Sequence, residues 1–443
     1  MSIIGKVANS LQTALGVSLD ELGRQTGVIK RQRKFSGSTL LKTMVLTLLK
    51  FPNAKPDQFV TTAAQLGVVV TPQAFEKRLS PELISFLRAS LEHLLEQTVS
   101  ASPSMIPLLK RFTAVEVGDS TMVTLPDEFA DEFPGCGGTS GSGKAAVKIQ
   151  ARWDLLSGKL GKVVVEPGRC SDGQNEAAED DLKPGSLTIR DLGYFSLKRF
   201  QALGANGVYW ISRWQQGTLV FDPEGRPLEL LEHLRRNQGK GPIDMPILLG
   251  TAERLPCRLI ALRVPQEVAN RRRQTAYEKA RKHGRMPTQE HLDWCEWTIL
   301  VTNCPEDLLT WKEVIVLYRA RWQIELMFKL WKSHNHLAAY RQTWSAVERM
   351  AMFWAKLIGV VLQHWLLLTS TWSDHRRSLW KAAQVVSEWI GTLTVVLDDE
   401  GRLIDTLTKM SAAAAAVAKT KLRRRRPSSF QLLLDPELLD WGC

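Results

Sequence analysis

A run of polar side chains between residues 318 and 332 has the types and spacing to do chemistry. At about 100° per residue these side chains share one stripe of a helix; they are Tyr318, Arg321, Glu325, Lys329 and Lys332. A neighbouring stripe is apolar enough to be buried and consists of Leu317, Ile324, Phe328 and Trp331. One carboxylate therefore lies among cations and a phenol on a helix that packs against a core. Such a set suits an anionic, metal-bound substrate.

Two aspartates directly follow apolar runs that alternate like strands. Asp119 follows residues 115–118 and Asp191 follows residues 187–190, each with the parity of the apolar side chains before it. Two Mg²⁺ ions roughly 4 Å apart, held by carboxylates, can activate a water and stabilise the leaving oxygen when a phosphodiester is cut. Asp119, Asp191 and Glu325 are the candidates for such a site. The alternative is that the aspartates only end strands or form turns.

These residues carry a resemblance to a known family. The spacing Tyr318-x2-Arg321-x3-Glu325-x6-Lys332 resembles the YREK signature of bacterial insertion-sequence transposases with an acidic D-D-E triad. Val-Gly-Asp-Ser-Thr at 117–121 resembles their first acidic motif, and Asp-Leu-Gly-Tyr-Phe at 191–195 resembles the second. The carboxylates are 191 − 119 = 72 and 325 − 191 = 134 residues apart. The long second interval is similar to that of members with a β-rich insertion, expected here at about 215–296.

The resemblance implies an α/β fold with three parts. An RNase H-like, mixed-sheet catalytic domain would occupy residues 106–345 and carry the β-rich insertion. A helical N-terminal domain, residues 1–105, would bind the DNA ends. A helical C-terminal domain, residues 346–443, would mediate dimerisation and synapsis.

The residue patterns predict several elements independently of the resemblance. Residues 145–155 and 159–165 alternate as two strands of a hairpin around Ser157-Gly158. A helix is expected at 196–203, closed by Gly204, and the remaining strands follow the same reasoning: they are 208–212, 218–221, 258–264 and 297–302.

The implied activity is cut-and-paste transposition, with cleavage at the element ends, a hairpin intermediate and strand transfer into target DNA. Asp119, Asp191 and Glu325 would hold two Mg²⁺ ions, for which Mn²⁺ could substitute. DNA phosphates would be bound by five side chains of matching chemistry: Tyr318, Arg321, Lys332, Lys329 and Arg213. Trp297 and Trp322 would stack on a flipped base, with packing in the core as the alternative for both.

The N-terminal part contains a pattern typical of a helix-turn-helix. One helix is expected from Pro56 to Gly67, and a second begins at Thr71-Pro72 with N-cap and N1 chemistry. Gln73, Lys77 and Arg78 lie near the expected start of the second helix, where they could contact DNA. An ordinary helical hairpin with a solvated basic face is the alternative.

The bulk properties favour a polyanionic partner or an acidic membrane surface, and the resemblance implies that the partner is double-stranded DNA. The chain of 443 residues has a net charge of +12, which favours a polyanion. Its six cysteines are dispersed and predict neither a zinc site nor a disulfide framework. The most apolar window, 350–372, contains lysine, glutamine and histidine, and so predicts a buried helix rather than a membrane span. These properties predict a cytoplasmic protein that contacts no membrane, and the resemblance implies a bacterial, nucleoid-associated protein that acts as a homodimer.

The sequence leaves three alternative functions to weigh: a nucleotide-binding protein, a regulator and a nuclease. The glycines at 138–143 followed by Lys144 imitate a phosphate-binding loop, but Ala145 replaces the hydroxyl that would hold Mg²⁺, so no nucleotide cofactor is expected. A catalytically silent DNA-binding regulator of transposition and a stand-alone RNase H-like nuclease are the other two. The intact carboxylate triad and YREK residues argue against the regulator.

Overall fold

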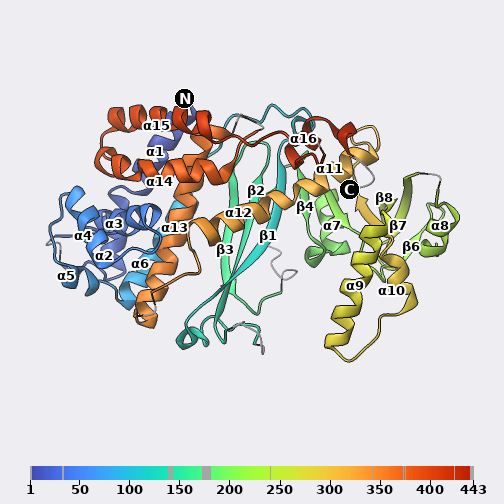
Figure 1. Cartoon of the computed structure of the whole chain (residues 1–443), viewed down its shortest axis with the longest axis horizontal. Coiled ribbons are helices and arrows are strands. Elements are labelled where there is room, and N and C mark those ends of the chain that lie inside the picture. The colour runs from blue at the N-terminus through green and yellow to red at the C-terminus, as the bar shows by residue number, and fades with distance from the viewer. Residues whose placement is uncertain are drawn as a thin grey trace. The chain divides into compact units, whose positions relative to one another are not determined.

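The chain divides into two compact units in a computed structural model, which describes residues 2–439 apart from 32–33, 138–142, 172–180, 240, 342, 373, 375 and 424 (Figure 1). Unit 1 consists of Met1–Met105, Asp119–Cys170 and Ile324–Lys421. Unit 2 consists of Ile106–Gly118, Ser171–Gln323 and Leu422–Cys443. The glycine-rich loop falls largely outside the described residues, whereas the strand predicted after it is present.

The N-terminal part of unit 1 is helical, as predicted. Its helices are α1 (Ile3–Ala14), α2 (Ser18–Gln25), α3 (Gly37–Lys50), α4 (Pro56–Gln65), α5 (Pro72–Glu76) and α6 (Pro81–Leu95). Gly67 follows α4 with φ +80°, and the Thr71 hydroxyl accepts a hydrogen bond from the Ala74 N–H, so both predicted boundaries are confirmed. The position of two basic residues was predicted wrongly. Because α5 has only five residues, Lys77 and Arg78 follow its end rather than lying near its start.

Helix α13 (Ala346–Thr371) is the central helix of unit 1 and packs against α3, α6, α14 (Leu379–Val396) and α15 (Glu400–Val417). By length and composition α13 could cross a membrane, but its most apolar window is 100% buried. The prediction of a buried helix at 350–372 is confirmed.

Strands β2 (Ala146–Asp154) and β3 (Leu160–Pro167) form the predicted antiparallel hairpin of unit 1. Its turn contains Gly158 at φ +73°, a left-handed conformation that glycine adopts without strain. The turn docks on α13, because the Gly158 carbonyl lies 2.7 Å from Nε2 of His364. Just beyond the helix, the Trp372 indole N–H donates to the Leu156 carbonyl at 3.1 Å.

Unit 2 is built on a mixed sheet whose strands lie in the order β1-β4-β5-β9-β8-β7-β6. The strands are β1 (Val115–Thr124), β4 (Leu187–Arg190), β5 (Tyr209–Arg213), β6 (Val220–Phe221), β7 (Ile243–Leu249), β8 (Leu255–Arg263) and β9 (Trp297–Thr302). The pairs β1–β4 and β4–β5 are parallel, and the pairs from β5–β9 outward to β7–β6 are antiparallel. Strand β1 is common to both units, since its residues from Asp119 onward belong to unit 1. The mixed α/β fold is confirmed.

The expected insertion adds to this sheet. Between residues 215 and 296 the described chain forms strands β6, β7 and β8 together with helices α8 (Leu230–Arg236), α9 (Gln266–Lys282) and α10 (Gln289–Trp294). Strand β8 pairs with β9 over six residues, from Arg258 opposite Thr302 to Arg263 opposite Trp297. Apolar side chains of the insertion share one core with β5, β9 and α7 (Leu197–Ala205). The insertion is therefore a continuous extension of the sheet of unit 2.

The single helix expected over residues 318–332 is interrupted. Helix α11 (Trp311–Ala320) ends before Arg321, α12 (Trp322–Lys329) follows, and a π-helical turn covers Leu330–His334. The Arg321 N–H donates to the Tyr318 carbonyl at 3.2 Å, a tightened turn that breaks the regular helical pattern. The side-chain directions calculated at about 100° per residue for a regular helix therefore do not hold across this whole segment.

Candidate active site

A cavity of about 400 Å³ in unit 2 brings together four of the side chains singled out in the sequence. Asp191 follows the last residue of β4, Arg213 is the last residue of β5, Tyr318 lies in the last turn of α11, and Arg321 follows that helix. The parallel pairing of β4 and β5 brings the ends of the two strands together at one edge of the sheet. A carboxylate, a phenol and two guanidinium groups thus converge from three segments of the chain.

The phenol of Tyr318 is a hydrogen-bond donor to the carboxylate in this cavity. Its hydroxyl lies 3.4 Å from Oδ1 of Asp191. Burial raises the pKa of Tyr318 and the negative charge of Asp191 raises it further, whereas Arg321 and Arg213 act in the opposite direction. The phenol therefore stays protonated and can orient the carboxylate.

Sequence reasoning missed Arg272 of helix α9, which also lines the cavity. Its guanidinium donates to the Trp297 carbonyl and to the Thr298 hydroxyl, both at 2.8 Å. Burial and the nearby charge of Arg213 lower the pKa of Arg272. A signal was present in the sequence, because Ala269, Arg272 and Ala276 share a helix face at spacings of three and four residues, and both alanines are buried.

Two further arginines of the cavity, Arg263 and Arg319, complete its cationic lining. Arg263 is paired with Glu296 at 3.0 Å, with side chains 49% and 24% exposed. Arg319 is exposed on the last turn of α11. The cavity thus has five arginines around one aspartate, so it is suited to an anionic ligand.

Asp119 occupies the position on β1 that corresponds to Asp191 after β4. The last register pair of these parallel strands is Gly118 opposite Arg190. Asp119 directly follows Gly118 in the chain, and Asp191 directly follows Arg190. A side chain at Gly118 would meet the Arg190 guanidinium at 2.5 Å, so the glycine leaves room for this arginine to lie across β1. Asp119 is half-buried, and its Oδ1 accepts a hydrogen bond from the Ser120 N–H at 2.8 Å.

The other residues of the polar stripe belong to unit 1. On α12 Glu325 is half-buried and Lys329 is exposed. Lys332 lies in the π-helical turn, where burial lowers its pKa. The predicted apolar stripe beside them is confirmed, because Leu317, Ile324, Phe328 and Trp331 are all buried.

The two tryptophans have different environments. Trp297 is 6% exposed and belongs to the hydrophobic core of unit 2. This is the environment of the alternative left open for it, packing in the core, and its stacking on a base stays a prediction. Trp322 is 54% exposed at the start of α12.

The candidate metal ligands are carboxylates, the hard oxygen donors that Mg²⁺ prefers. Asp191 opens on a cavity with room for a ligand, so the donor chemistry fits a divalent cation. Within the part of the chain that the structure describes, no group of three histidine, cysteine, aspartate or glutamate side chains lies close enough to hold a metal ion. Asp191 is in unit 2, and Asp119 and Glu325 are in unit 1.

Comparison with known proteins shows a consistent set of similarities. The family model described as "Transposase DDE domain" matches residues 113–358. The transposase for insertion sequence element IS231F of Bacillus thuringiensis subsp. israelensis is 30% identical over 338 residues, 71% of this chain and 70% of the relative. The transposase for IS231C of Bacillus thuringiensis subsp. berliner is 27% identical over 423 residues, 87% of this chain and 85% of the relative. The putative transposase InsL for IS186A of Escherichia coli (strain K12) is 41% identical over 335 residues, 73% of this chain and 83% of the relative.

Proposed function

The chain belongs to the family of transposases with a DDE domain, which has an RNase H-like fold. From this premise we propose that it performs cut-and-paste transposition of an insertion sequence. It is a DNA-cleaving enzyme that acts on the ends of such an element. The proposed steps are cleavage at the inverted repeats, a hairpin on the flanking DNA and joining of the freed 3′-hydroxyl to target DNA. The cavity that joins Asp191 to Tyr318, Arg213 and Arg321 is the observation that carries the proposal.

We propose Asp119, Asp191 and Glu325 as the ligands of the divalent ions that this family generally uses, here Mg²⁺ with Mn²⁺ as a substitute. When bound, such ions supply an activated water and stabilise charge on the leaving oxygen. Support comes from the matched positions of the two aspartates after the pair Gly118 and Arg190. The Tyr318 hydroxyl holds one Asp191 oxygen, which leaves the other oxygen for coordination.

The cations beside these carboxylates would hold the DNA strand in line for the reaction. Arg213 and Arg321 line the same cavity as Asp191, so they are the proposed contacts to the scissile phosphate region. Arg272 joins them as a positioning residue, because its hydrogen bonds fix it to the backbone of β9. Lys329 and Lys332 would contact phosphates farther along the strand, and Trp322 is the more exposed candidate for stacking on a flipped base.

The helical ends of the chain have proposed roles in assembly. Residues 1–105 would bind the inverted repeats of double-stranded DNA, with Gln73, Lys77 and Arg78 among the contacts. Residues 346–443 would mediate the homodimer that brings two element ends together. Such an enzyme works in the bacterial cytoplasm, associated with the nucleoid.

The deciding experiment follows cleavage of a duplex that carries the element end from the chain's own flanking DNA. We expect Mg²⁺-dependent nicking by the wild-type protein. We expect Glu325→Ala to reduce nicking to the background of a metal-free reaction, because a metal ligand is lost, while affinity for the duplex stays within several-fold. Glu388→Ala is the matched control, since it removes an exposed carboxylate from α14 of the same unit.

Each rival function gives a different result in this experiment. A wild-type protein that binds the ends without cutting them would support a catalytically silent regulator. Equal cutting of unrelated DNA, without joining of a 3′-hydroxyl to a second duplex, would support a stand-alone nuclease. Normal cleavage by Glu325→Ala would remove the metal assignment.

A further inference from the structure

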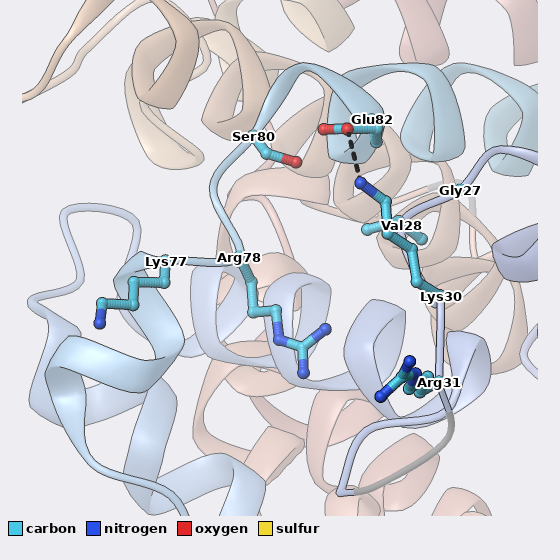
Figure 2. Close-up of a pocket in the computed structure, with 8 residues that line it drawn as sticks. All are labelled: Gly27, Val28, Lys30, Arg31, Lys77, Arg78, Ser80 and Glu82. Atoms are coloured by element: carbon cyan, nitrogen blue, oxygen red, sulfur yellow. Dashed lines mark hydrogen bonds and ion pairs between the residues drawn. The ribbon is translucent and has the colours of Figure 1, made fainter.

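A second cationic cavity lies among the N-terminal helices of unit 1, with a volume of about 510 Å³ (Figure 2). Three chain segments line it: the loop after α2, the turn after α5 and the start of α6. Its lining contains four cations and one carboxylate, which are Lys30, Arg31, Lys77, Arg78 and Glu82. The concave wall is therefore strongly positive.

Buried neighbours fix both loops that carry the cations. Gly27 turns the chain at the end of α2 with φ +77°, and Val28 and Ile29 beside it are buried. Within α5, just before the turn that carries Lys77 and Arg78, Phe75 is buried and stacks on Phe59 with ring centroids 4.7 Å apart. The cations stand on anchored backbone, so little order has to be gained when a ligand binds.

Most of the positive charge in this cavity is available to a ligand. Lys30 meets Glu82 at 3.5 Å, but the side chains are 77% and 40% exposed, so this pair contributes little. Within the described ranges no ion pair engages Arg31, Lys77 or Arg78. Arg31 and Lys77 are exposed, and the half-buried Arg78 extends toward the side of the cavity on which Arg31 lies (Figure 2).

We propose that this cavity binds backbone phosphates of double-stranded DNA, an inference that rests on the proposed function. Phosphate oxygens accept the forked hydrogen bonds of arginine, and lysine adds point charge. Base reading requires an element that enters the major groove, whereas α5 has five residues and these cations lie on loops. Lys30 and Arg31 therefore join Lys77 and Arg78 in a contact that positions DNA without reading its sequence.

The test measures DNA binding in the Glu325→Ala background, so that cleavage does not interfere. The equilibrium affinities of Arg31→Gln/Arg78→Gln and of the parent are compared from about 50 to 200 mM salt, on element-end DNA and on random duplex of equal length. Losing two phosphate contacts should lower the affinity roughly 10- to 100-fold near 0.1 M salt and reduce the slope of log affinity against log salt by about 2. The affinity of the variant for the two duplexes should fall by the same factor.

A matched control is Arg402→Gln/Lys409→Gln, which removes two exposed cations from α15 of the same unit, outside the cavity. Its affinity and salt slope should equal those of the parent. An unchanged slope in the cavity variant, a loss confined to element-end DNA, or a stronger effect on duplex RNA would each overturn the proposal. These readouts need no catalysis, so failure of the cleavage experiment and failure of this inference are separately visible.

Discussion

Two tryptophans of unit 2, Trp297 and Trp322, differ in the solvent exposure of their side chains. Trp297→Ala should lower the free energy of unfolding by about 3–5 kcal/mol, because it empties a site in the core. Trp322→Ala should change stability by less than about 0.5 kcal/mol, since the ring is 54% exposed. If Trp322 stacks on a flipped base, its loss should weaken binding of a nicked element end by about 1–3 kcal/mol.

Denaturant unfolding and binding of nicked DNA measure the two effects. Trp380→Ala is a matched control, because Trp380 is 40% exposed on α14 and has no proposed role in DNA binding. Unchanged binding of nicked DNA by Trp322→Ala would refute the stacking role.

His364 makes the stability of unit 1 depend on pH. Burial lowers its pKa from the ordinary 6.5 to about 4, and its Nε2 lies 2.7 Å from the Gly158 carbonyl. Since the unfolded chain takes up the proton first, this contribution is complete above pH 6.5 and is lost as the pH falls toward 4. The loss should reach roughly 3 kcal/mol. Unfolding curves from pH 7 to 4 should show a steeper decline for the wild type than for His364→Gln, which cannot be protonated; parallel profiles would contradict the assignment.

At the scale of elements, the β2–β3 turn tests how a hairpin is held on a helix. Gly158→Ala adds a methyl group that meets Leu368 at 2.5 Å and Trp372 at 2.6 Å, in a left-handed conformation. Gly67→Ala has a similar φ, +80°, with nothing within 4 Å. Thermal unfolding should show a cost of about 1 kcal/mol for Gly67→Ala and roughly 1–3 kcal/mol more for Gly158→Ala. Equal costs would mean that the turn yields without disturbing α13.

Elements with local signals could be predicted from the sequence. Proline at N1 and glycine after the helix predicted the two ends of α4. Alternation of apolar and polar residues around Ser157-Gly158 predicted the hairpin. The interruption at Arg321 and the π-helical turn after Lys329 could not be read locally, because apolar periodicity continues through both. The short length of α5 was missed for a similar reason, since the turn through Lys77 and Arg78 contains neither glycine nor proline.

For the candidate site, the identity of the functional side chains was easier to predict from the sequence than the burial and neighbours of each one. The cavity contains Asp191, Arg213, Tyr318 and Arg321, all named from spacing and resemblance. The burial of Trp297 could not be predicted, because strand position does not reveal which face of a sheet an insertion covers. Arg272 lies 81 residues from Asp191 in sequence (272 − 191), so only the folded insertion could bring it to the cavity.

At the scale of the whole molecule, each of the two units has a concave site with a cationic lining. Unit 1 has the cavity of Lys30, Arg31, Lys77 and Arg78, and unit 2 has the five arginines around Asp191. Both linings have the sign that a polyanion requires, as does the net charge of +12. Each unit therefore has its own candidate anion-binding site, and the proposed DNA contacts do not depend on one surface alone.

The strand order of unit 2 also determines which edge would be exposed if the insertion were shortened. The insertion enters at the outer strand β6 and returns inward through β7 and β8 to β9, so sequence order and spatial order run together. Removing β6 and β7 would leave β8 as a new outer strand, with the β5–β9 register untouched. Removing β8 as well would bare the edge of β9 and the core around Trp297. Shortening from the rim would therefore keep the β5–β9 register but would also remove core side chains of the outer strands, among them Val220, Ile247 and Leu249.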